Sequence, residues 1–325
     1  MVTRSATASL IAAMLLGGCG TDARPERVVG DAAMGAGTPT LLGAEAGTVY
    51  WSVSAGTGPK LVAGSSLATL PAEGQQLGTA SGPIAHVGDH VVFSTDGTIV
   101  RAGVATPAMK VVTVTAEALG ESAERDPIVV WTEGPGVSWG NGDIMGSATL
   151  SKIVRCDHLR VTATSIYVAA DGTSGERRLL RVDRKTGVVF PLTASNPHAT
   201  SFPGGGAEGA AYRGRLVGAD ELGALWLVEE TAAGATSPTR AILVSLPEQG
   251  TSSVVLENIR GTSAFFTGAD AFYWQEGDAL LTASRAGGAA SILGHLPATA
   301  GAIDAGFVYF IEGNAIERLP RDALD

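Results

Sequence analysis

The sequence predicts an all-β fold, a β-propeller of seven four-stranded blades preceded by a signal peptide. The first observation is a recurring strand pattern: an apolar residue, a Tyr or second apolar residue, and an aromatic residue or Val, followed by a turn rich in Gly, Asp or Asn. Its seven occurrences end at Trp51, Phe93, Trp139, Val168, Trp226, Trp274 and Phe310. Their mean spacing of about 43 residues falls within the blade period of roughly 40–50 residues. The second observation is that no helical period separates them.

Each repeat shows the succession of strands expected within one blade. A shorter apolar run and a polar turn precede the aromatic end, as in residues 267–274 and 302–310. A tight turn such as Asp96-Gly97 follows, because Asp and Gly favour the positive φ of hairpins. Third strands are indicated at 99–101, 179–182, 242–244 and 315–319, and fourth strands at 188–190 and 254–256. Three hairpins per repeat predict antiparallel blades around a channel.

The third repeat leaves the number of blades open. Two strand patterns lie close together there, at residues 128–131 and 137–139, and the next repeat ends only 29 residues after Trp139. Because one of these patterns could belong to a neighbouring blade, a ring of six blades is the alternative to seven.

The last repeat is one strand short. After residues 315–319, Pro320 interrupts the pattern and only residues 321–325 remain. Propellers avoid an exposed edge by pairing strands from the two ends of the chain. Residues 25–30 form the only apolar stretch before the first blade within 40–325. We therefore expect residues 25–30 to supply the missing strand and close the ring.

The first twenty residues have the pattern of an export signal. Arg4 precedes an apolar stretch at 6–16, which is shorter than the about 20 residues of a membrane-spanning helix. The stretch runs into Leu-Gly-Gly-Cys, ending at Cys19, and resembles the lipobox of bacterial lipoproteins. The resemblance implies removal of residues 1–18, acylation of Cys19 including palmitate, and a location in the bacterial cell envelope. This would be at the outer membrane, the periplasmic face or the cell surface, with two acyl chains holding a linker over 19–39.

Composition fits an exported β domain. Gly accounts for 44 of 325 residues, about twice the average usage, and charged residues are 17%. The net charge of −10 argues against nucleic acid or an anionic lipid surface as an electrostatic partner. With Cys19 acylated, Cys156 has no intramolecular disulfide partner. We expect a monomer without a cofactor.

Several segments resemble the divergent propeller repeats of bacterial exported proteins, akin to the YWTD, NHL and Tol-associated types. The resemblance rests on Val49-Tyr50-Trp51, on Phe272-Tyr273-Trp274 and on residues 181–187, and it covers residues 40–325 loosely. The Thr-Asp of YWTD repeats is absent, because Ser52-Val53 and Gln275-Glu276 follow the two aromatic pairs. No functional residue is carried over from these repeat types.

Two motifs suggest catalysis or nucleotide binding but lack the required context. Residues 136–140 match G-x-S-x-G around Ser138, yet a nucleophile elbow needs a following helix, and here a hairpin turn follows. Residues 204–209 match G-x-G-x-x-G, yet a pyrophosphate site needs this loop to open a helix in a βαβ unit. We expect neither to be functional.

Metal and thiol chemistry are equally weakly indicated. His86 and His90 have a spacing that converges on zinc only on a helix, whereas strands are predicted at these positions. Residues 171–176 offer oxygen ligands for calcium but fit a solvated hairpin turn better. Cys156 fits a buried strand thiol better than a nucleophile. We predict no metal site, and we expect the five tryptophans to pack within the blades.

Two classes of function remain. We favour a lipid-anchored binding or scaffold module for an envelope protein or polymer, which contacts its partner through rim loops. The non-periodic insert at 195–212, with His198, Phe202 and Tyr212, is the candidate binding loop, since long loops on rigid scaffolds often carry function. The alternative is a propeller enzyme, a glycan hydrolase or lyase, with carboxylates gathered at the channel mouth.

Overall fold

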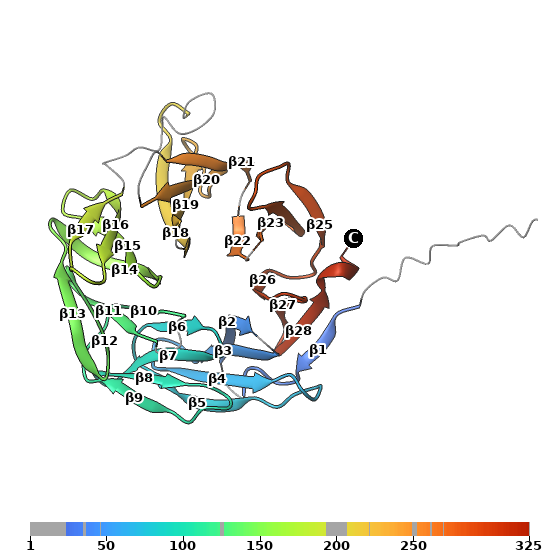
Figure 1. Ribbon diagram of the computed structural model, residues 1–325. Helices are drawn as coiled ribbons and strands as arrows, with labels where there is room; N and C mark the ends of the chain where they lie inside the picture. The colour runs from blue at the N-terminus through green and yellow to red at the C-terminus, as the bar shows by residue number, and fades with distance from the viewer. Residues whose placement is uncertain are drawn as a thin grey trace, which may run out of the picture.

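Seven antiparallel sheets of four strands each surround a central channel, so the seven-bladed prediction is confirmed and the six-bladed alternative is wrong (Figure 1). The computed structural model describes residues 24–34, 37–45, 47–123, 127–192, 207–220, 222–248, 252–260, 262–268 and 270–324. Blades 1 to 6 each contain four consecutive strands, and in each the first strand lies innermost and the fourth outermost.

The strands follow one another around the ring blade by blade. Blades 1 and 2 are β2 Thr38–Glu45, β3 Thr48–Ser54, β4 Lys60–Ser66, β5 Gln75–Ala80, and β6 Ile84–Val87, β7 His90–Thr95, β8 Thr98–Ala102, β9 Met109–Val112. Blades 3 and 4 are β10 Ala118–Glu121, β11 Val129–Glu133, β12 Gly136–Asn141, β13 Asp143–Thr149, and β14 Ile153–Val161, β15 Ser165–Gly172, β16 Arg177–Asp183, β17 Val189–Pro191. Blades 5 and 6 are β18 Ala211–Asp220, β19 Gly223–Thr231, β20 Arg240–Pro247, β21 Ser253–Ile259, and β22 Thr262–Thr267, β23 Ala271–Glu276, β24 Ala279–Ser284, β25 Ser291–His295. Blade 7 is β26 Ala300–Ile303, β27 Phe307–Glu312, β28 Ala315–Pro320 and β1 Glu26–Val29, and the 3₁₀ turn η1 Arg321–Ala323 follows β28.

The repeated aromatic pattern marks the second strand of a blade in six of seven cases. The exception is blade 3, where Trp139 lies on the third strand, β12, and Trp131 occupies the second strand, β11. The prediction that Trp139 lies at the same place in its blade as the other six pattern ends is therefore wrong. Both tryptophans are buried, at 2% and 3% exposure, because both strands lie inside the sheet. Because β11 and β12 are both inner strands, both have the same pattern of apolar residues ending in a buried tryptophan.

The first described strand completes the last blade, as expected from the missing strand. β1 pairs antiparallel with β28, with Glu26 opposite Arg318 and Val29 opposite Ile316. The Val28 carbonyl also accepts a hydrogen bond from the Ala72 N–H at 2.7 Å, which links β1 to the β4–β5 connection of blade 1. Segments from the two ends of the chain thus close the seam between blades 7 and 1.

The core lies between the blades, where the apolar faces of neighbouring sheets meet. All five tryptophans are buried there, which confirms their expected role in packing. Polar side chains also bridge neighbouring blades. These bridges are Tyr50 to the Asp89 carbonyl, Arg101 to Glu121, Tyr167 and Arg181 to Glu248, and Arg285 to Asp220. Each is made by partners at least 20 residues apart in sequence.

The ring has two faces with different loops. The hairpins that join first to second strands, such as the one at Gly88, lie on one face, which we call the first-hairpin face. The blade-to-blade connections and the hairpins between second and third strands, such as the one at Asp96-Gly97, lie on the opposite face, the second-hairpin face. Asp96 and Gly97 have φ of 47° and 71°, as their turn position requires.

Candidate functional site

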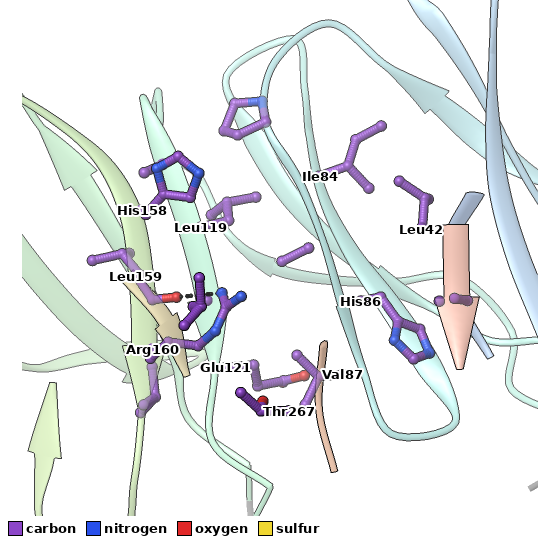
Figure 2. A pocket seen from close by; sticks show the side chains of 18 of the residues that line it. Leu42, Ile84, His86, Val87, Leu119, Glu121, His158, Leu159, Arg160 and Thr267 are labelled. Carbon is purple, nitrogen blue, oxygen red and sulfur yellow. Dashed lines mark hydrogen bonds between the residues drawn. The ribbon is translucent and has the colours of Figure 1, made fainter. Parts of the chain in front are cut away.

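The central channel holds a cavity of about 640 Å³, within the size range of small-molecule sites. All seven innermost strands, β2, β6, β10, β14, β18, β22 and β26, contribute to its wall. Because an innermost strand has a sheet neighbour on its outer side only, its inner edge faces the channel. Figure 2 shows charged and imidazole side chains among the apolar ones that line this cavity.

Glu121, at the end of β10, is one of two carboxylates on the described cavity wall that an arginine holds. Its side chain is fully buried, accepts a hydrogen bond from the Arg101 guanidinium, and is also bonded to His90 Nε2. The other ring nitrogen of His90 lies 3.0 Å from Asp89 Oδ1. Burial lowers the pKa of His90, but the hydrogen bonds to Glu121 and Asp89 outweigh burial and raise it overall. This cluster joins blade 2 to blade 3.

Asp157 on β14 is the second carboxylate on the cavity wall that an arginine holds. Arg177 on β16 donates to Asp157 Oδ1 at 2.6 Å and to Asp171 Oδ1 at 2.9 Å, and His158 Nδ1 lies 3.0 Å from Asp157 Oδ1. Burial would raise the pKa of Asp157, but its bonds to His158 and Arg177 hold the pKa well below its ordinary value. Asp157 is therefore fixed as an anion, the opposite of what a general acid requires.

His86 on β6 lines the same cavity as a neutral group. Burial lowers its pKa to about 4, so the ring is uncharged near pH 7. It packs 5.3 Å from the Tyr50 ring, centroid to centroid, and directly over Gly43, where any Cβ would collide with it. Its Nε2 atom is buried and has no hydrogen-bond partner among the described residues. His86 therefore fills space between blades 1 and 2.

Arg160 on β14 is the one arginine of the described residues that lines this cavity. Its Nη1 donates to the carbonyl of its own neighbour Leu159 at 2.9 Å. The guanidinium is accessible to solvent inside the channel and yet surrounded by protein, so that burial lowers its pKa. Sequence reasoning missed this residue, although a charge between Leu159 and Val161 on a first strand is a recognisable departure from the apolar pattern.

These groups favour binding over proton transfer. Of the four carboxylates on the wall, Glu121 and Asp157 already accept an arginine, whereas Glu45 and Glu117 are exposed to solvent. His90 and His158 contact carboxylates, and His86 is a neutral ring. In the part of the chain that the structure describes, no three His, Cys, Asp or Glu side chains gather in a group able to hold a metal ion.

The residues proposed from the sequence have different outcomes. Cys19, His198 and Phe202 lie outside the described residues. Tyr212 does not lie on a loop: it belongs to β18, and its hydroxyl donates to the buried Glu230 carboxylate at 2.9 Å. Arg240 Nε and the Ala207 N–H also donate to Glu230, at 2.7 and 3.0 Å. Tyr212 thus fixes the end of the connection to its own blade.

The other sequence motifs lie in ordinary strands and turns. Ser138 lies within β12, opposite Trp131 and Ser147. Cys156 on β14 is 1% exposed, and burial raises its pKa to about 12, as expected of an inert thiol. Residues 173–176 form the hairpin between β15 and β16. Residues 204–206 of the glycine-rich motif lie outside the described chain.

Comparisons with known proteins support the fold. No family model and no curated protein matches the sequence. Among solved structures, the WD40 β-propeller domain of Doa1 is 10% identical, with a TM-score of 0.56 over 91% of this chain and 96% of that one. The extracellular domain of a hybrid two-component system from B. thetaiotaomicron is also 10% identical, with a TM-score of 0.56 over 92% of this chain and 42% of that one. At such identity these likenesses establish a β-propeller and nothing finer.

No helix in the described part of the chain is long and apolar enough to cross a membrane.

Proposed function

We propose that the chain is a binding or scaffold module of the bacterial cell envelope, anchored through lipid on Cys19. The lipobox-like sequence supports the anchor, and the closed ring with rim loops supports binding. The fold does not itself specify a partner, because propellers serve many functions.

The observation that carries the proposal is the register of β1. Glu26 pairs with Arg318, near the end of β28, whereas Val29 pairs with Ile316, near its beginning. The Ala32 N–H beyond β1 then donates to the Asn314 carbonyl, in a hairpin of the second-hairpin face, at 2.6 Å. β1 therefore begins on the first-hairpin face. A tether from Cys19 to Pro25 spans at most ~20 Å and would hold this face toward the membrane.

The partner would then bind the second-hairpin face. The connection between β17 and β18, which contains most of the insert proposed from the sequence, begins after Pro191 and ends before Ala211 on that face. The β19–β20 turn of the same blade also lies there. A membrane-anchored ring would thus have both ends of this connection on the face away from the lipid.

The enzyme alternative has one observation in its favour, since several acid and base groups line the channel: Glu45, Glu117, Glu121, Asp157, His86 and His158. However, Arg101 holds Glu121 and Arg177 holds Asp157, while Glu45 and Glu117 are exposed to solvent on blades 1 and 3. A glycosidase needs one carboxyl group that is protonated and one that is free. The arrangement supports binding better than hydrolysis.

Photocrosslinking from the two faces of blade 5 tests the proposal in cells. A photoreactive amino acid replaces Thr236, exposed in the β19–β20 turn, or Leu222, exposed in the β18–β19 hairpin of the opposite face. We expect a discrete crosslinked partner from position 236 and none from position 222. Crosslinking from position 222 alone would overturn the assignment of the faces.

The anchor is tested separately with Cys19→Ala. We expect release from the membrane fraction or accumulation of an uncleaved precursor. A normally processed variant that stays in the membrane fraction would contradict the lipid anchor. It would not affect the conclusion about the binding face, which the crosslinking experiment tests separately.

A further inference from the structure

Arg160 lines the central channel as a cation without a counter-ion among the described residues. Its hydrogen bond is to the Leu159 carbonyl, and no carboxylate of the described residues pairs with it. By contrast, the wall carboxylates Glu121 and Asp157 are paired with arginines of other strands, Arg101 on β8 and Arg177 on β16. Figure 2 shows the Arg160 side chain among the residues that line the cavity.

The side chain of Arg160 is exposed to solvent within the channel. Protein surrounds the guanidinium, and burial is the cause that lowers its pKa. In surroundings of lower dielectric constant than bulk water, the attraction between this charge and an anion is stronger than on an open surface. Two exposed carboxylates also line the wall, Glu45 on blade 1, three blades away from β14, and Glu117, which precedes β10 on blade 3. Arg160 forms an ion pair with neither of them. The channel therefore contains a position suited to an anionic group beside Arg160.

The rest of the wall is suited to a hydroxylated ligand. The inner edges of seven strands carry backbone N–H and C=O groups that have no strand neighbour on the channel side. Donors and acceptors alternate along such an edge, and a hydroxyl group can both donate and accept. The Thr267 hydroxyl lines the same cavity. A volume of about 640 Å³ accommodates a molecule of the size of a sugar with room for water.

We propose that the channel is a binding site for a small polyhydroxylated anion, with Arg160 as the residue that binds its carboxylate or phosphate group. The hydroxyl groups of such a ligand bond to the strand edges, and the planar guanidinium bonds to two oxygens of the acid group. The site is separate from the rim surface proposed for a macromolecular partner, and it requires no lipid anchor.

Calorimetric titration of the purified chain from residue 20 onward, which contains all 28 described strands, tests this site. The probes are glucuronate, glucose 6-phosphate and neutral glucose. We expect both acids to bind at least about tenfold more tightly than glucose, because only they can pair with Arg160. Inorganic phosphate, which has the charge without the hydroxylated body, should bind more weakly than glucose 6-phosphate. A preference for one acid over the other distinguishes a carboxylate ligand from a phosphate ligand.

Two variants locate the binding. Arg160→Gln should weaken binding of the preferred acid at least about tenfold, whereas Arg213→Gln, which removes the same charge from an exposed position on β18, should change it less than about twofold. Arg160→Lys, which keeps the charge but loses the planar fork, should fall between them. Equal binding of glucose and the two acids by the unmodified chain overturns the proposal without any variant. Equal effects of the Arg160 and Arg213 substitutions would overturn it as well.

Discussion

The double substitution Val28→Ala and Val29→Ala should destabilise the whole ring, although both residues lie near one end of the chain. Both side chains are fully buried at the seam between blades 7 and 1, in a cluster with Trp51, Tyr309 and Ile316. Their strand pairs with β28 and bonds to the β4–β5 connection. Weakening β1 therefore loosens the one place where the two chain ends hold the ring closed.

The expected loss follows from the carbon removed. Each substitution deletes two methyl groups' worth of apolar burial, at about 0.8 kcal/mol per carbon, and leaves a small cavity. The free energy of unfolding should fall by about 2 kcal/mol per site and about 4 kcal/mol in total, against a usual stability of about 5–15 kcal/mol.

Urea unfolding followed by circular dichroism measures the effect. The variant should show one transition at lower urea with an unchanged slope, because all blades unfold together. The matched control is Val154→Ala with Val188→Ala, at valines 59% and 47% exposed, which should cost about 1 kcal/mol or less. Equal stability of the two double variants, or rapid amide exchange at Val28 and Val29 in the intact protein, would show that β1 does not hold the ring closed.

Three further predictions concern individual side chains. The pKa of His90 is raised in the folded chain, so its contribution to stability should be full below about pH 6.5 and decline as the pH rises through the native pKa. The difference in unfolding free energy between the protein and His90→Gln, measured in urea at several pH values, should therefore become smaller as the pH rises. Cys156, whose pKa is raised to about 12, should resist alkylation by iodoacetamide at pH 8 and react once urea unfolds the chain, and fast labelling of the folded protein would contradict its burial. Tyr212→Phe should lower stability by about 1 kcal/mol, because the hydrogen bond to Glu230 is lost, and should leave partner crosslinking from position 236 unchanged. Loss of crosslinking in a stable variant would instead show that Tyr212 binds the partner.

The blade architecture could be predicted because its signal is local and repeated. A second strand is covered by neighbouring blades on both faces, so it is apolar throughout, and a tight turn at its end specifies the next strand. The same logic explains the error in blade 3. β11 and β12 are both inner strands, each contains a buried tryptophan, and burial alone does not distinguish the second strand from the third.

The channel chemistry could not be predicted in the same way, because it depends on which residues of different blades meet. Arg101 and Glu121 are 20 positions apart, and the strands that line the cavity containing Arg160 come from all seven blades. A charged residue on a first strand is visible in the sequence, but its consequence depends on its neighbours. Glu121 meets an arginine and becomes part of the contact between two blades. Arg160 meets no carboxylate among the described residues, and this difference, which only the closed ring reveals, makes one charge structural and the other a site for a ligand.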